Sequence, residues 1–250
     1  RVLIFHYITR DQYKKFENLI IQLNKNFQII SPNEFKEIIN GNKKIYNDSI
    51  LISFDDGYKS QFKASKILDK YKIKAIFFIT LNFVKLKSKK KVKQFLKNNL
   101  GVGKFFHKDF LNIKNMNFSD VNNLLKSGHK VGAHTFNHSD LSKVTLREQK
   151  KEIVQYKKFF YKQFNSRDIK NFAFTFGGVK NLNHSSINIA LNSYNFVHTG
   201  IRGNNYNNKQ KLIFRDNCDL HLSCREIFFF LNGFGDFYYA FKRHNLNKIL

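Results

Sequence analysis

The regular alternation of short apolar runs with segments of helical periodicity constrains the fold of this chain more than any other feature. Residues 1–8 (RVLIFHYI), 49–54 (SILISF) and 74–80 (KAIFFIT) are almost continuously apolar. A strand with one face in water would alternate apolar and polar residues, so these runs indicate strands that are buried on both faces. Between them, segments such as 11–24 carry apolar residues at helical spacing. This order predicts an α/β fold in which helices cover a parallel sheet.

The same alternation continues toward the end of the chain. Further strands are predicted at 27–30, 130–133, 172–176, 195–201 and 211–216, and further helices at 32–41, 59–71, 119–128, 145–164, 184–193 and from 223 onward. The 250 residues contain no internal repeat and no linker. We therefore expect a single domain over residues 1–250.

Residues 81–118 break this rhythm, and they include the Lys-dense stretch KLKSKKKVKQFLKNN. We interpret this segment as a solvated insertion, and contact with an anionic substrate is the alternative. The net charge of +26, from 44 Lys and Arg against 18 Asp and Glu, suits an anionic partner, but a composition bias explains it as well. No RNA-binding or zinc-finger pattern accompanies the lysines, so nucleic acid is not the expected partner.

The aromatic and basic stretch after Ser223 would suit an anionic membrane or glycan surface, and a buried terminal helix explains it equally well. Within the given residues there is no signal-peptide pattern and no apolar run near the roughly 20 residues of a membrane span. The cytoplasm and the cell envelope both remain open as locations. Cys218 and Cys224 are compatible with a disulfide or with two free thiols. The sequence does not indicate an oligomeric state.

Polar residues follow several predicted strands at their carboxyl ends. His6 follows the first strand, and the adjacent pair Asp55 and Asp56 follows the third. His134 and His138 follow the strand that precedes them. The carboxyl ends of parallel strands lie at one side of such a fold, where active sites are built. We therefore expect these side chains to share one site.

The spacing of His134 and His138 indicates a metal site. Residues four apart on a helical turn share a face, so both imidazoles can reach one ion, although a chance pair of histidines is the competing interpretation. With one carboxylate they leave coordination positions open for water and substrate. Such donors suit Zn²⁺ first and Co²⁺, Fe²⁺ or Ni²⁺ as alternatives. Non-haem iron oxygenases share these donors, but the alternation of strands and helices argues against their fold. His129 is expected at the surface.

Two of these segments resemble the polysaccharide deacetylase family (carbohydrate esterase family four). SFDDG (53–57) resembles the first family motif, T/S-F-D-D-G, and HTFNH (134–138) resembles the second, H-S/T-x-x-H. The resemblance implies an irregular (β/α) barrel of about seven parallel strands. It also implies that Asp55 is the general base and that Asp56 binds the metal together with the two histidines of the second motif, His134 and His138.

The third family motif, commonly F-R/A-x-P-Y/F-G, corresponds to FAFTFG at 172–177 with two departures. Ala173 replaces the Arg that many members use to orient the base, and Thr175 replaces the usual Pro. The resemblance implies that an Arg from a later strand can substitute, and Arg215 is the candidate. A surface cation beside Asp216 is the alternative for Arg215.

The last family motif supplies a histidine that acts as general acid. No convincing L-x-H-D motif occurs in the C-terminal part of the chain. In circularly permuted members this histidine lies on the first strand in a Y-H-x-V/I setting, which FHYI (5–8) resembles. His6 is therefore the candidate acid, and a core histidine on an apolar strand is the alternative.

The resemblance implies a hydrolase that acts on carbon–nitrogen bonds other than peptide bonds. We expect metal-dependent removal of N-acetyl, or O-acetyl, groups from a bacterial surface polysaccharide, peptidoglycan or a glycan precursor. An N-acetylated glycan is then the expected partner. The alternative is an inactive deacetylase-like domain that only binds glycan, and the altered third motif favours it.

Overall fold

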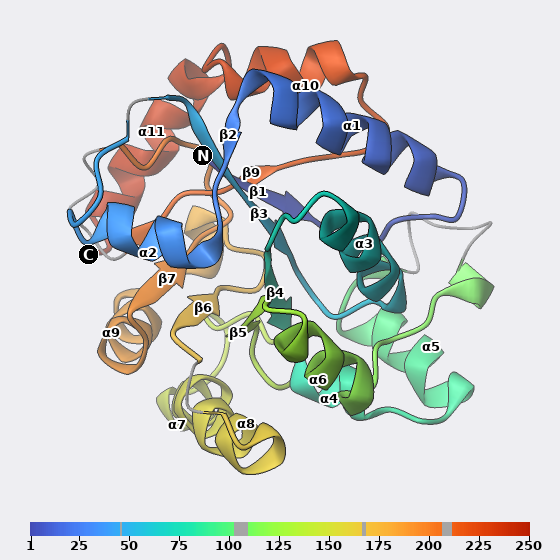
Figure 1. Cartoon of the computed structure of the whole chain (residues 1–250). Helices are drawn as coiled ribbons and strands as arrows, with labels where there is room; N and C mark the ends of the chain where they lie inside the picture. The colour runs from blue at the N-terminus through green and yellow to red at the C-terminus, as the bar shows by residue number, and fades with distance from the viewer. Residues whose placement is uncertain (46, 103–109, 167–168, 207–211) are drawn as a thin grey trace.

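The computed structural model consists of a parallel sheet surrounded by helices, and it describes all residues except 46, 103–109, 167–168 and 207–211 (Figure 1). The strands are β1 (Val2–Phe5), β2 (Gln28–Ile29), β3 (Ser49–Phe54), β4 (Ile76–Ile79), β5 (Lys130–Ala133), β6 (Asn171–Ala173), β7 (Phe196–His198), β8 (Leu212–Ile213) and β9 (Asp216–Asn217).

The helices alternate with these strands along the chain. They are α1 (Gln12–Asn26), α2 (Pro32–Ile39), α3 (Lys59–Lys70), α4 (Leu81–Lys85), α5 (Lys89–Asn98), α6 (Phe118–Lys126), α7 (Leu146–Lys150), α8 (Tyr156–Phe164), α9 (His184–Ser193), α10 (Cys224–Leu231) and α11 (Asp236–Asn247). No helix in the described ranges is long and apolar enough to cross a membrane.

The strand order is β8-β7-β6-β5-β4-β3-β1-β9, all neighbours are parallel, and β2 pairs separately with β3. Strands β8 and β9 lie at opposite ends of this order, yet they belong to one short segment, 212–217. Its first half pairs with β7 and its second half pairs with β1, so the sheet curls into an irregular barrel. The prediction of an α/β barrel of about seven parallel strands is confirmed.

Continuous apolar strands form the core because both of their faces are covered. All residues of β1 and β4 are buried. Phe54 of β3 stacks on Phe77 of β4 at 4.7 Å between ring centroids. Phe16 of α1 packs edge-on against Phe5 of β1 at 5.2 Å. The apolar stripe of α1 is therefore part of the same core as the strands.

The helix predicted at 145–164 has the expected start but not a uniform geometry. Thr145 and Glu148 form the predicted capping box. A π-helical turn, Lys151–Gln155, then separates α7 from α8. π-Helical turns are rare and often occur at functional sites, because the wider turn redirects the side chains on it.

The interpretation of residues 81–118 as a solvated insertion is wrong in one respect, because apolar side chains of this segment are buried. Lysines of α5 face solvent, but Val92 and Leu96 are buried in a small cluster with Phe83 and Tyr58. Tyr58 belongs to the chain directly after the Asp55–Asp56 pair. The segment thus packs against the strand ends where the site was predicted. Its residues 103–109 lie outside the described part of the chain.

The expected surface position of His129 is also wrong, because its side chain is buried. Its Nδ1 accepts a hydrogen bond from the backbone N–H of Ala75 at 3.1 Å. Its Nε2 lies 3.3 Å from Oδ1 of Asp69. Burial is the main cause that lowers the pKa of His129 to about 4, although Asp69 opposes it. The imidazole is therefore neutral in the folded protein at neutral pH.

We expect the free energy of unfolding to fall as the pH is lowered from about 6.5 to about 4. The unfolded chain protonates His129 near pH 6.5, whereas the folded chain does so only near pH 4, so the unfolded state binds more protons between these values. The contribution of this group is about 3 kcal/mol. Urea unfolding at several pH values measures it. His129→Gln, which keeps an acceptor for Ala75, should flatten the slope, and an unchanged slope would contradict the assignment.

Candidate active site

Side chains from four strand ends line one cavity of about 580 Å³. His6 follows β1, Asp55 and Asp56 follow β3, His134 follows β5, and Arg215 lies between β8 and β9. Leu100 to Val102, from the Lys-rich segment, also line the cavity. The structure therefore brings together the residues that the strand-end argument predicts to share a site.

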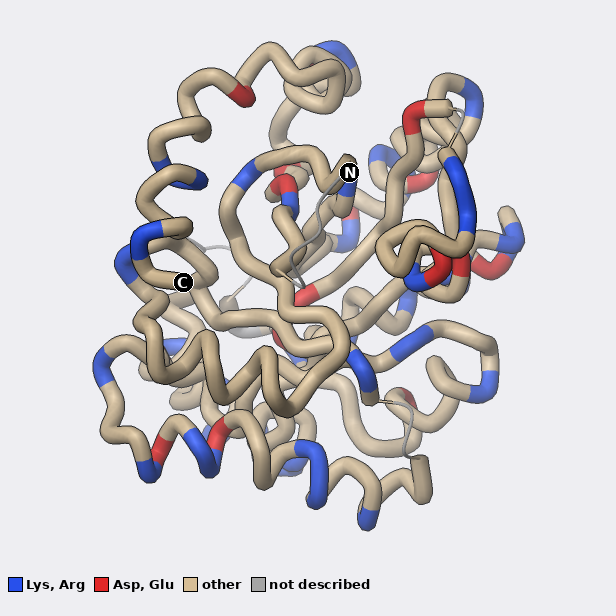
Figure 2. Tube along the Cα trace, turned by 90° about the vertical axis from the view of Figure 1, so that its left-hand side faces the viewer, with Lys and Arg blue, Asp and Glu red and all other residues tan. Residues whose placement is uncertain are grey.

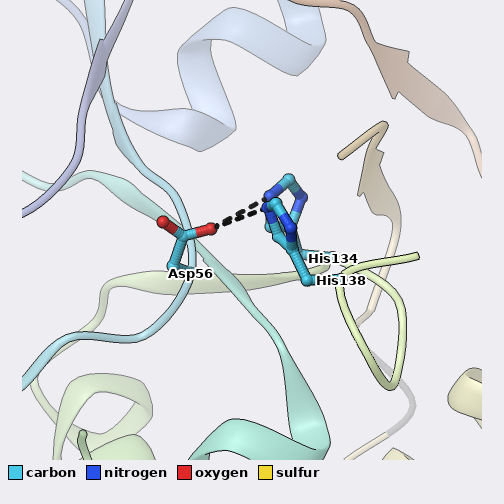
Figure 3. Close-up of side chains that lie close together, drawn as sticks. All are labelled: Asp56, His134 and His138. Atoms are coloured by element: carbon cyan, nitrogen blue, oxygen red, sulfur yellow. Dashed lines mark ion pairs between the residues drawn. The ribbon is translucent and has the colours of Figure 1, made fainter. Parts of the chain in front are cut away.

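Asp56, His134 and His138 form a buried cluster with the arrangement of a metal site. Oδ1 of Asp56 lies 3.4 Å from Nε2 of His134 and 3.2 Å from Nε2 of His138 (Figure 3). One potential ligand atom from each residue lies within 4.8 Å of the other two. These three residues would hold the ion.

The two histidines are oriented by backbone carbonyl groups. Nδ1 of His134 lies 2.9 Å from the carbonyl oxygen of Ala173, and Nδ1 of His138 lies 3.0 Å from that of Asn99. A carbonyl oxygen can only accept, so we assign the proton to Nδ1 in both rings. The lone pairs of both Nε2 atoms then face Asp56. A cation placed between them could be bound by both Nε2 atoms and by a carboxylate oxygen of Asp56.

The electrostatics of the cluster favour added positive charge. Oδ1 of Asp56 is buried and has no hydrogen-bond partner. Burial acts to raise the pKa of Asp56, but His134 and His138 outweigh it and hold that pKa well below its usual range. Burial acts to lower the pKa of His134, but Asp55 and Asp56 outweigh it, so that pKa is raised. The chemistry of this donor set fits Zn²⁺ and related divalent ions.

Arg215 holds Asp55 through two parallel hydrogen bonds. Its terminal nitrogens donate to Oδ1 and Oδ2 of Asp55 at 2.8 and 2.9 Å, and its Nε donates to the carbonyl oxygen of Thr199 at 2.8 Å. Burial acts to raise the pKa of Asp55, but Arg215 and His134 outweigh it, so Asp55 remains ionised at neutral pH. Arg215 is 1% exposed, so the alternative of a surface cation is wrong; Asp216 pairs instead with Arg1.

The altered third motif still supports the site. The carbonyl group of Ala173 orients His134, which requires no particular side chain. The hydroxyl of Thr175 donates to the carbonyl oxygen of Ser139, directly after the second histidine. Phe176 is 55% exposed, and its ring lies 4.8 Å from that of His138. The positive charge that the motif lacks is present in Arg215.

Backbone strain is concentrated at the cluster. Asp56, Thr135 and His138 adopt left-handed conformations with φ of 84°, 59° and 56°. Non-glycine residues rarely do so, and such conformations are often found at functional sites. Gly57 follows with φ of 99°, and a Cβ atom there would lie 3.0 Å from Cγ1 of Val84. A side chain at residue 57 would therefore crowd α4 and disturb the position of Asp56.

His6 lies at the edge of the cavity, and its side chain is exposed. The alternative of a core histidine on an apolar strand is therefore wrong. The backbone carbonyl group of His6 accepts a hydrogen bond from Nε2 of Gln61 at 3.2 Å, and the same amide nitrogen also donates to the carbonyl group of Asp55. Gln61 thus ties the chain at His6 to the chain at Asp55.

Glu152 is a site residue that the motifs did not indicate. It lies on the π-helical turn and is 4% exposed. Its Oε2 accepts from the backbone N–H groups of Phe136 at 2.6 Å and Asn137 at 3.1 Å, and its Oε1 accepts from Nδ2 of Asn137 at 2.7 Å. Glu152 therefore holds the loop that carries His134 and His138.

A sequence signal for Glu152 does exist in the helical periodicity. Gln149, Ile153 and Tyr156 are buried, and Glu152 falls on the same stripe. A carboxylate on an apolar stripe needs hydrogen-bond donors, because burial without them is costly. The pattern could thus have indicated a buried partner, but not which loop provides it.

We expect Glu152→Ala to lower the affinity for Zn²⁺ by about 10- to 100-fold, as is typical when a group that orients metal ligands is removed. The loop loses its acceptor, so the separation of the two histidines is no longer fixed. Glu152→Gln keeps one oxygen that can accept from the backbone N–H groups of the loop, so it should recover part of the affinity for Zn²⁺. Competition with a chromophoric chelator measures the affinity independently of catalysis. Exposed Glu148→Gln is the control, and equal affinities of wild type and Glu152→Ala would contradict this role.

Comparison with known proteins agrees with this geometry. The family model described as Polysaccharide deacetylase matches residues 42–192. The Bacillus subtilis (strain 168) protein YxkH, whose name places it among the polysaccharide deacetylases, is 26% identical over 174 residues. That match covers 66% of this chain and 53% of YxkH, so the chain spans about half the length of this curated relative.

Two solved structures share the fold over nearly the whole chain. The deacetylase PplD from Streptococcus pyogenes, in complex with acetate, has a TM-score of 0.68 at 17% identity. The match covers 91% of this chain and 95% of the PplD chain. IcaB from Ammonifex degensii has a TM-score of 0.69 at 16% identity, and the match covers 93% of this chain and 96% of the IcaB chain. These likenesses cover a larger share of the chain than the family match does.

Proposed function

This chain belongs to the polysaccharide deacetylase family, and we propose that it catalyses metal-dependent hydrolysis of acetyl groups on a glycan. The substrate we propose is an N-acetylated, or O-acetylated, bacterial surface polysaccharide, peptidoglycan or glycan precursor. The observation that carries the proposal is the position of an Arg-held carboxylate, Asp55, beside the Asp56–His134–His138 cluster in one open cavity.

The residues of the cavity supply the groups that amide hydrolysis needs. A divalent ion held by Asp56, His134 and His138 would polarise the acetyl carbonyl group and increase the acidity of water. Asp55, kept ionised by Arg215, accepts a proton from the attacking water. The water oxygen bonds to the acetyl carbon, the carbon–nitrogen bond breaks, and acetate leaves.

His6 completes this mechanism as the general acid. An amine is a poor leaving group unless it is protonated as the carbon–nitrogen bond breaks, so an acid must lie near it. The exposed imidazole of His6 is at the edge of the cavity, where a sugar amine can approach it. Asp55 thus removes a proton from the water, and His6 donates a proton to the leaving amine.

Acetate release from a panel of glycans tests the proposal. The panel contains chitin-like oligomers, peptidoglycan fragments and poly-N-acetylglucosamine. We expect release from at least one member, loss of release after treatment with a chelator, and recovery on addition of Zn²⁺ or Co²⁺. Protein that holds stoichiometric metal, binds glycan and frees no acetate would instead support the alternative, a binding domain with an inactive site.

A further inference from the structure

Five aromatic side chains of α10, α11 and the loop between them are exposed to solvent. We call this group the aromatic face: Phe229, Phe234, Phe237, Tyr238 and Phe241, which are 50%, 63%, 86%, 80% and 71% exposed. Helix α10 lies at the top of Figure 1 and α11 at its upper left, in orange to red. Scattered exposed apolar residues are ordinary, but a contiguous group marks an interaction surface.

The rings of the aromatic face form two groups. Phe237, Tyr238 and Phe241 occupy positions i, i+1 and i+4 of α11, so they share one side of the helix. The rings of Phe229 and Phe234 stack at 4.5 Å between centroids. Within α11, all of which the structure describes, Leu246 is the one buried side chain. The expectation of a buried terminal helix is therefore wrong for these rings.

Basic residues outnumber acidic ones in the segment that carries the aromatic face. The stretch 224–248 carries the basic residues Arg225, Lys242, Arg243 and Lys248, against two acidic residues. Both acidic residues have partners: Asp236 forms an ion pair with Arg1 at 2.5 Å, and Glu226 caps α10 through Ser223. Figure 2 faces the side of the molecule that carries α11, and Lys and Arg positions outnumber Asp and Glu on it.

The aromatic face lies away from the mouth of the catalytic cavity. Asp236, at the start of α11, is bonded to Arg1, which precedes β1. His6, at the edge of the cavity, follows the other end of β1. A partner that covers the aromatic face therefore leaves the cavity open.

We propose that the aromatic face docks on the surface of a lipid bilayer that contains anionic phospholipids. Protruding rings on the convex side of a helix can enter the boundary between headgroups and acyl chains, while the nearby cations contact the headgroup phosphates. A second copy of this chain is a poorer occupant, because each copy carries a net charge of +26. Charge complementarity thus favours the anionic bilayer.

Vesicle co-sedimentation tests the docking with two lipid compositions, phosphatidylcholine alone and phosphatidylcholine with phosphatidylglycerol. Wild type should bind the anionic vesicles, and salt should weaken the binding. Phe237→Ser combined with Phe241→Ser should reduce the partition coefficient at least about tenfold. Tyr161→Ser, an exposed aromatic on α8, is the matched control and should bind as wild type does.

A second variant, Lys242→Glu combined with Lys248→Glu, separates the contribution of charge to vesicle binding from that of the rings. It should weaken binding to the anionic vesicles and leave the aromatic rings in place. All variants should keep the wild-type circular dichroism and acetate release from a soluble glycan. Three results would overturn the proposal: no binding of wild type, equal binding by the Phe237→Ser, Phe241→Ser variant, or a wild-type dimer that this variant loses.

Discussion

Asp55→Asn should reduce the turnover number for acetate release by about 1,000-fold, since general-base catalysis typically contributes between 100- and 10,000-fold. Asparagine has the shape of aspartate and keeps an acceptor for Arg215, but it cannot take a proton from water. Asp55 is not one of the three residues that would hold the ion, so the metal content should stay close to that of wild type. Steady-state kinetics and metal analysis on the same sample measure both quantities.

A comparison with His6→Ala distinguishes the base from the acid. Loss of the acid should reduce turnover mainly for amide substrates, because an O-acetyl ester has a better leaving group that needs less protonation. Asp55→Asn should reduce turnover for amides and esters alike, since both need an activated water. Acetate release by Asp55→Asn within a few-fold of wild type would refute its role as the base.

Arg215→Ala should lower both the stability of the fold and the activity at a given pH. Removing one partner of a buried ion pair typically costs about 3–5 kcal/mol, since the other charge is left buried without its partner. Arg215 and Asp55 are 1% and 3% exposed, so this case applies. Without the guanidinium, the pKa of Asp55 rises, so a smaller fraction is ionised at each pH. The acid limb of the pH–rate profile should therefore move to higher pH.

Urea unfolding and a pH profile of kcat/KM measure the two effects of Arg215→Ala. Arg215→Lys restores the charge but cannot donate to both carboxylate oxygens in parallel, so it should recover part of the activity and keep the acid limb near its wild-type position. Exposed Arg225→Ala is the control for removing a guanidinium. An acid limb that does not move in Arg215→Ala would show that Arg215 only stabilises the fold.

Much of the fold could be predicted because its determinants are local. Continuous apolar runs need burial on both faces, and this requirement selects strands in a covered parallel sheet wherever they occur. The capping box at Thr145 and Glu148 is likewise set within four residues. The Lys-rich segment was misread because lysine dominates its composition, while a few apolar side chains, Val92, Phe95 and Leu96, decide how α5 packs.

The sequence alone determined most of the strands and helices and the residues that follow the strand ends, because periodicity and short motifs act over a few neighbouring positions. Only the tertiary structure decided which distant groups meet. Arg215 reaches Asp55 across 160 positions because a single segment pairs with both β7 and β1 as the barrel closes. Glu152 reaches the histidine loop through a π-helical turn that no pattern in the sequence marks. The exposure of the aromatic face also depends on which side of α11 the barrel covers.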